Sequence, residues 1–282
     1  MTDHPRLSDL AAQYDAVLCD VWGVIRDGRS LVQPALDALE KYRAQGGTVV
    51  LVSNSPRRSA SLKTHLSELG GTPRHFDEAV TSGDAIHSVL TARAPGPAFK
   101  LGPDWDDPLY EGTGLDFAPL KEAEFVSCTG LFDYETETPD QYEDLLREAQ
   151  LRRFDMVCAN PDIIVQVGDE LRYCAGALAQ MYEKMGGTVI LAGKPHPPIY
   201  DLAYAKIEAI GGEPADKSRI LAIGDGPGTD IAGAQREGVD ALFIAGGITS
   251  GRLQGGFSEE RAQALLAEDG LSARFCAPGL VW

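Results

Sequence analysis

Short apolar runs alternate with amphipathic stretches near both ends of the chain. The runs predict strands at residues 16–21, 48–53, 79–82, 188–193, 220–224 and 241–244. The amphipathic stretches between them predict helices at residues 33–45, 56–70, 198–210 and 230–237. Continuous apolar strands that alternate with helices favour an α/β fold in which a parallel sheet is covered on both faces.

The middle of the chain differs from both ends. It contains a Pro/Gly-rich stretch at residues 94–97, an acidic loop near Asp133 and an amphipathic helix predicted at 175–185. A segment of about 90 residues is long enough to fold as a unit. We therefore expect a core formed by residues 1–95 and 188–282, and an inserted α/β domain at residues 96–187.

Composition and charge narrow the possible functions. The chain has 282 residues, of which 44% are hydrophobic and 24% charged, as in ordinary globular proteins. No apolar run approaches the roughly 20 residues of a membrane span, and the first residues lack the pattern of a secretory signal, so we expect a cytoplasmic protein. The net charge of −17 repels phosphate backbones and anionic lipid, which argues against nucleic-acid and membrane partners.

Chemically suggestive residues follow four of the predicted strands. Asp20 ends the first strand, Ser53-Asn54 ends the second, and Lys194 follows the strand at 188–193. The fourth group is Asp225 and Asp230, directly after the strand at 220–224. Because ligands of open parallel sheets bind outside the carboxyl ends of the strands, we expect these loops to converge on one site.

The residue types of this group suit a phosphate and a hard cation. The carboxylates of Asp20 and Asp225 can hold Mg²⁺, which prefers a few carboxylates together with waters and substrate phosphate. Ser53 offers a hydroxyl at a helix entrance, where free backbone N–H groups also favour an anion. Lys194 adds a positive charge, and a carboxylate such as Asp20 can act as a covalent nucleophile.

In this order, the motifs resemble those of the haloacid dehalogenase superfamily of phosphohydrolases. The similarity is greatest to the NagD-like class IIA group, whose large cap is inserted between the second and third motifs. Residues 20–28 resemble the nucleophile motif and its flap, 52–54 the second motif, 193–195 the lysine motif and 224–230 the acidic motif. The resemblance implies a Rossmann-like core, an α/β cap and phosphatase activity on a small phosphorylated metabolite.

The resemblance also implies roles for individual residues. Asp20 would attack phosphorus with the help of Lys194. Mg²⁺ would be held by Asp20, Asp225 and the backbone carbonyl of Trp22, with Asp230 supporting the metal or Lys194. Phosphate would be bound by Ser53, Asn54 and Lys194. Homodimers formed through the cap are common in similar proteins.

Trp22 departs from the family pattern, because the family's usual second Asp protonates the leaving oxygen and indole cannot. Three explanations remain open. The substrate has a good leaving group, another residue such as Asp27, His196 or an acid of the cap supplies the proton, or the protein is slow and mainly binds its ligand. The indole either stacks on a ring of the substrate or only fills space.

Two stretches of the inserted segment are further candidates for substrate contact. Residues 131–138, with Asp133 and Glu135, resemble the substrate-specificity loop of capped relatives. Acids there would disfavour a leaving group with extra negative charge and would suit a neutral polyol or an amine. The alternative is a solvated acidic turn. Asn160 and Asp162 lie in a stretch that is typical of the same subgroup.

Overall fold

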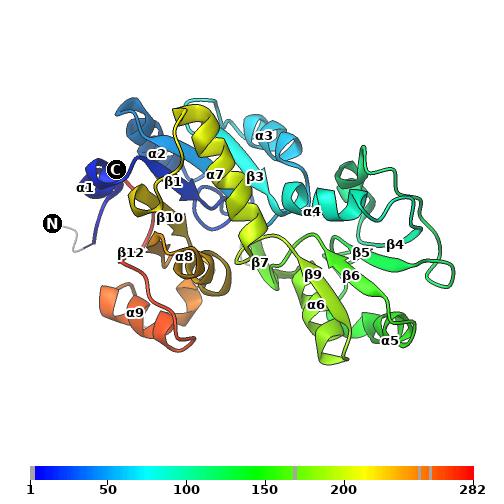
Figure 1. Ribbon diagram of the computed structural model, residues 1–282. Coiled ribbons are helices and arrows are strands. Elements are labelled where there is room, and N and C mark those ends of the chain that lie inside the picture. Colours follow the sequence, from blue (N-terminus) through cyan, green and yellow to red (C-terminus); the bar gives the residue numbers. More distant parts are fainter. Residues whose placement is uncertain (1–3, 168–169, 247–248, 254–255) are drawn as a thin grey trace.

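A six-stranded and a four-stranded parallel sheet organise the computed structural model, which describes residues 4–167, 170–246, 249–253 and 256–282 (Figure 1). The larger sheet has the order β12 (Phe275–Ala277), β11 (Asp240–Ile244), β10 (Ile220–Gly224), β1 (Ala16–Cys19), β2 (Thr48–Ser53) and β3 (Glu78–Thr81). The smaller sheet has the order β4 (Ala98–Leu101), β5 (Phe125–Cys128), β6 (Asp155–Cys158) and β9 (Thr188–Leu191). The strands β7 (Ile164–Val167) and β8 (Glu170–Tyr173) form a separate antiparallel pair.

The helices connect these strands. They are α1 (Leu7–Leu10), α2 (Gln33–Ala44), α3 (Ser59–Glu68), α4 (Ser82–Thr91), α5 (Glu143–Leu151), α6 (Ala175–Lys184), α7 (Pro197–Gly211), α8 (Ala232–Glu237) and α9 (Glu259–Ala267). Shorter turns are η1 (Ala11–Gln13), η2 (Asp104–Tyr110), η3 (Pro139–Tyr142), η4 (Lys217–Arg219), η6 (Ser250–Arg252) and the π-helical η5 (Pro227–Ile231). Within the described part of the chain, no helix combines the length and the apolar character needed to cross a bilayer.

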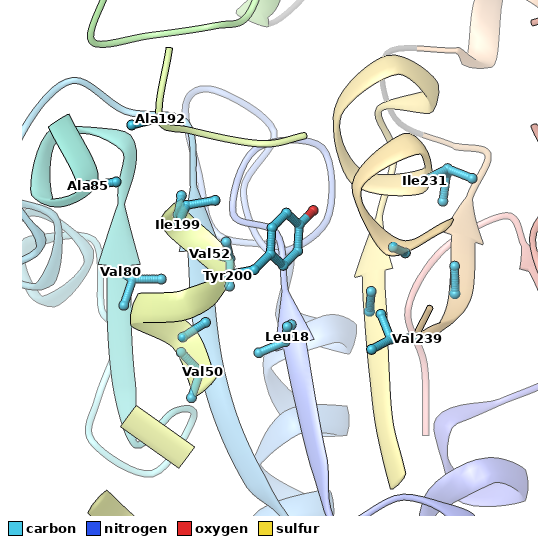
Figure 2. Packing of buried hydrophobic residues seen from close by; sticks show 14 of the residues in the cluster. Leu18, Val50, Val52, Val80, Ala85, Ala192, Ile199, Tyr200, Ile231 and Val239 are labelled. Carbon is cyan, nitrogen blue, oxygen red and sulfur yellow. The ribbon is translucent and has the colours of Figure 1, made fainter. Parts of the chain in front are cut away.

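Helices cover both faces of the six-stranded sheet because successive strand residues point to opposite sides. Val49 and Leu51 of β2 pack toward α1, α2 and α3, whereas Val50 and Val52 pack toward α4, α7, α8 and α9. Figure 2 shows Tyr200 of α7 lying over the strands on the second face. This arrangement confirms the predicted parallel α/β core.

The four-stranded sheet is also covered on both faces. Its outer face packs against α5 and α6 through residues such as Leu146 and Tyr182. Its inner face, including Phe125 and Val157, belongs to the same apolar cluster as Ile86 of α4. The inserted segment therefore shares buried surface with the core instead of being joined to it by linkers alone.

The strand at 188–191 differs from the expectation. The apolar run was expected to belong to the core, but β9 pairs with β6 in the smaller sheet, in a register that places Thr188 opposite Asp155. Periodicity identifies a strand and contains no information about its partner. The division into core and cap remains a proposal, and the pairing of β9 favours a second boundary after Leu191 instead of before Thr188.

We expect Leu51→Ala to lower the free energy of unfolding by about 2–5 kcal/mol, because truncation of a buried leucine removes apolar contacts and leaves a cavity. Leu51 is 0% exposed in the central strand β2. Leu151→Ala is the matched control, since that side chain is 76% exposed. Urea denaturation followed by circular dichroism measures both. Equal losses in the two variants would contradict the assigned core.

Candidate active site

Four loops bring the predicted residues together at the carboxyl edge of the six-stranded sheet. Asp20 follows β1, Ser53 ends β2, Asp225 follows β10 and Asp230 lies in η5, while Lys194 enters from β9. All five side chains are buried, with residue exposures between 1% and 7%. They line a cleft of about 880 Å³. The predicted convergence of the four strand-end groups is therefore present.

Lys194 lies at the centre of this group. Its Nζ donates to Asp20 Oδ1 at 2.5 Å and to Asp230 Oδ1 at 2.7 Å. Burial alone would lower the pKa of Lys194, but the carboxylates of Asp20 and Asp230 outweigh burial and raise this pKa well above its ordinary value. The ammonium therefore stays charged and holds two acidic loops in place.

The carboxylates outnumber the lysine. Oxygens of Asp20, Asp225 and Asp230 lie within 4.8 Å of one another, and burial raises the pKa of Asp20 well above its ordinary value despite Lys194. Repulsion from Asp230 and Asp225 adds to that rise. A divalent cation would relieve this repulsion, and buried carboxylate oxygens are the ligands that Mg²⁺ prefers. The donor set thus fits the predicted metal.

Two glycines permit the close approach of the acids, and sequence reasoning missed both. A Cβ added to Gly23, which has a φ of +83°, would lie 1.9 Å from Asp225 Oδ2. A Cβ added to Gly224 would lie 2.1 Å from Cγ of Asp230. The loop after β1 therefore packs directly against the Asp225 carboxylate. The sequence signal was the presence of Gly23 and Gly224 in the motifs at residues 20–28 and 224–230.

Asn54 lines the same cleft as Ser53, and its side chain is bonded to the Lys194 loop. Its side-chain oxygen accepts from the Lys194 backbone N–H at 2.7 Å. Its amide nitrogen donates to the Lys194 carbonyl at 3.1 Å and to Asp162 Oδ1 at 2.8 Å. Both amide donations are thus made within the protein, so the side chain positions the Lys194 loop, and phosphate binding by Asn54 stays a prediction. Ser53 remains in the cleft wall as predicted.

Trp22 lines the cleft beside Asp20, and its indole is half-buried. The guanidinium carbon of Arg26 lies 4.3 Å from the centre of the indole ring. The position where the family pattern has a carboxylate is therefore occupied by an apolar ring that is stacked with a cation.

The other candidate residues divide into two groups. Asp27, Asp162 and His196 line the cleft. Asp133, Glu135 and Asn160 are not among its lining residues, so the expected contacts of these three with substrate are not supported. Asp133 instead accepts from the Glu135 backbone and from Thr136, which is the solvated acidic turn that the sequence left as the alternative. The Asn160 side chain accepts from the Asp162 backbone and fixes a turn.

Comparisons with known proteins agree with this geometry. A haloacid dehalogenase-like hydrolase family model matches residues 17–115, and a HAD-hydrolase-like model matches residues 191–269. The crystal structure of a haloacid dehalogenase-like family hydrolase from Brucella suis is 40% identical in sequence. The alignment covers 98% of this chain and 99% of the Brucella chain, with a TM-score of 0.89. The chain belongs to the haloacid dehalogenase-like hydrolases.

Two further relatives of this haloacid dehalogenase-like protein share a lower sequence identity with it. Chronophin from Rattus norvegicus is 27% identical over 93% of this chain and 83% of its own length. D-glycerol 3-phosphate phosphatase from Mycobacterium tuberculosis is 25% identical over 86% of this chain and 66% of its own length. The prediction of a capped, NagD-like phosphatase of the haloacid dehalogenase type is confirmed at the level of the family.

We expect Gly23→Ala to weaken metal-dependent activity about 10²-fold, because the new methyl group would displace Asp225 by an ångström or more. Gly228→Ala is the control, since Gly228 lines the same cleft and a Cβ added there would have no atom within 4 Å. Titration of hydrolysis against Mg²⁺ concentration measures the effect. A Gly23→Ala protein with the control's Mg²⁺ dependence would rule out this packing role.

Proposed function

We propose that this protein is a Mg²⁺-dependent phosphohydrolase that cleaves a small phosphomonoester through an aspartyl-phosphate on Asp20. The observation that carries the proposal is the buried group of Asp20, Lys194, Asp225 and Asp230 at the base of one cleft. Relatives named D-glycerol 3-phosphate phosphatase and acid sugar phosphatase support a sugar phosphate or a similar small metabolite as substrate, and a nucleotide is the other candidate.

The chain's own groups account for most of the proposed reaction. An oxygen of Asp20 forms a bond to phosphorus, and the ester P–O bond breaks with its electron pair leaving on the alcohol oxygen. The positive charge of Lys194 stabilises the negative charge on the phosphoryl oxygens, and the Ser53 hydroxyl can donate a hydrogen bond to one of them. Water then hydrolyses the aspartyl-phosphate and regenerates Asp20. Mg²⁺ held by Asp20, Asp225, Asp230 and the Trp22 carbonyl would supply further positive charge at the phosphoryl group.

The proton for the leaving oxygen cannot come from Trp22. Burial raises the pKa of Asp162, so this cleft residue keeps its proton to higher pH than an ordinary aspartate. Burial lowers the pKa of His196, so a smaller fraction of this side chain carries the extra proton at neutral pH. Backbone hydrogen bonds from Ser30 and Arg29 lower the pKa of Asp27. Asp162 is therefore the best supported replacement acid, and a leaving group that needs no proton is the alternative.

The second candidate function is a regulatory protein that binds a phosphorylated ligand with little or no turnover. Trp22 favours this function, because general acid–base help typically contributes about 10²–10⁴-fold to such reactions. Magnesium-dependent binding of a phosphate ester without release of phosphate would distinguish it from the enzyme.

We further propose that the protein works in the cytoplasm as a homodimer formed through the cap. All five cysteines are buried free thiols, as is usual in a reducing compartment. Exposed apolar side chains on the cap, including Leu171, Tyr173 and Phe132, are consistent with contacts between two copies. The strongly acidic composition supports neither nucleic acid nor membrane as a partner.

We expect Asp20→Asn to abolish Mg²⁺-dependent hydrolysis of p-nitrophenyl phosphate, with a loss of at least about 10³-fold, because the amide is a poor nucleophile. Asp144→Asn on the exposed face of α5 makes the same charge change and should retain full activity. Chelation of metal should stop the wild-type reaction, and added Mg²⁺ should restore it. Phosphate release by Asp20→Asn at the wild-type rate would end the proposed mechanism.

We expect Trp22→Asp to increase hydrolysis of alkyl phosphates by about 10–10²-fold while aryl phosphates gain little, since only poor leaving groups need a proton donor. Trp22→Phe keeps an aromatic ring and provides the control for loss of the indole. The ratio of kcat/KM for phenyl phosphate and a simple alkyl phosphate measures the effect. An unchanged ratio would indicate that Asp162 or another donor already serves the wild-type enzyme.

A further inference from the structure

Arg26 lies in the cleft wall, where its side chain contacts the backbone and an aromatic ring. Its Nη2 donates to the Gly28 carbonyl at 3.1 Å, and its guanidinium stacks on Trp22. Its Nε is buried and has no hydrogen-bond partner. Among the residues that the structure describes, no carboxylate forms an ion pair with this side chain, whereas nearby Arg57 and Arg58 pair with Asp106 and Asp84.

The surroundings of Arg26 disfavour its positive charge. Burial, and then the positive charge of Arg57, lower the pKa of Arg26, and the opposing effects of Asp27 and Tyr134 are smaller. The protein as a whole carries a net charge of −17, with 42 acidic residues available for pairing. A half-buried cation that lines a cleft and forms no ion pair with a described carboxylate is stabilised by an anion that enters that cleft.

The position of Arg26 places such an anion away from the reacting phosphate. The phosphoryl group belongs at Asp20 and Lys194, and the indole of Trp22 lies in the cleft wall beside this pair. Arg26 lies across the indole face, and the lining continues to Ile164 and Val165 of the β7–β8 hairpin. A substrate whose phosphoryl group lies at Asp20 and Lys194 would therefore present its leaving group to Arg26, beside the indole and the apolar residues of β7.

We propose that Arg26 is a specificity-determining residue that binds an anionic group, a carboxylate or a second phosphate, on the leaving group of the substrate. The proposal rests on the proposed phosphohydrolase function and deepens it. It replaces the preference for a neutral polyol or amine that the acidic loop at 131–138 suggested, because Asp133 and Glu135 do not line the cleft and Arg26 does. A charge-assisted bidentate contact is the mode of binding that a guanidinium favours.

The test compares phenyl phosphate with 4-carboxyphenyl phosphate and 1,4-phenylene bisphosphate, three esters that share one ring. Wild-type protein should show a higher kcat/KM for one or both anionic esters. Arg26→Gln should lower kcat/KM for the preferred ester by about 10–100-fold, mainly through KM, and change phenyl phosphate by less than about threefold. A preference for 4-carboxyphenyl phosphate would identify a carboxylate as the bound group, and a preference for 1,4-phenylene bisphosphate would identify a second phosphate.

Arg29→Gln is the matched control, since Arg29 lies on the same loop, lines the mouth of the cleft and is exposed. It removes an equal charge and should keep the preference for the anionic ester. Equal losses in Arg26→Gln and Arg29→Gln, or a wild-type protein that does not prefer either anionic ester, would overturn the proposal. Arg26→Lys, which retains the charge, should keep part of the preference if Arg26→Gln proves unstable.

Binding separates this proposal from the proposed function. Calorimetric titration of the Asp20→Asn protein with benzylphosphonate and 4-carboxybenzylphosphonate needs no turnover. Tighter binding of the carboxylated compound that Arg26→Gln removes would support Arg26 even if no ester were hydrolysed. If the wild-type protein hydrolyses esters but the Asp20→Asn protein binds both phosphonates equally well, Arg26 does not have the proposed role. The proposed phosphohydrolase function would then stand without it.

Discussion

The ammonium of Lys194, buried between the carboxylates of Asp20 and Asp230, is the interaction on which the site depends. Removing the Lys194 ammonium would leave both carboxylates uncompensated inside the protein, which costs about 3–5 kcal/mol. The three side chains come from distant parts of the sequence, so the ion pairs form only when the loops after β1, β9 and β10 meet. The same pairing keeps Asp225 close enough to complete a cation site. The fold therefore determines which charged side chains meet in the site.

The cap and the core are coupled at this same point. The Asn54 side chain, at the end of β2, joins the Lys194 backbone to the Asp162 carboxylate of the cap. The apolar cluster that contains Ile86 and Phe125 runs from one sheet to the other. A movement of the cap would therefore act on the loop that carries Lys194 as well as on the mouth of the cleft. The hydrogen bonds of Asn54 thus link the cap to the loop that carries Lys194.

The loop after β1 differs from the family pattern in the chemistry of its side chains. A proton donor is replaced by Trp22, and the cation of Arg26 is stacked on the indole. Gly23 in the same loop leaves room for the Asp225 carboxylate. Under the proposed function, loss of the acid would change the leaving-group side of the cleft and spare the metal, which would use only the main chain at position 22.

The sequence by itself determined the parallel α/β core and the order of the reactive residues, because apolar runs and the polar residues that end them are local features. Asp20, Ser53, Asp225 and Asp230 accordingly lie at the carboxyl edge of that core, whereas Lys194 reaches the same cleft from β9 of the smaller sheet. Only the tertiary structure decided that β9 pairs with β6, that the Asn54 amide is used internally, and that Arg26 faces the cleft while Asp133 and Glu135 do not. Strand partners and loop paths depend on contacts between residues far apart in the chain, and these leave no local pattern.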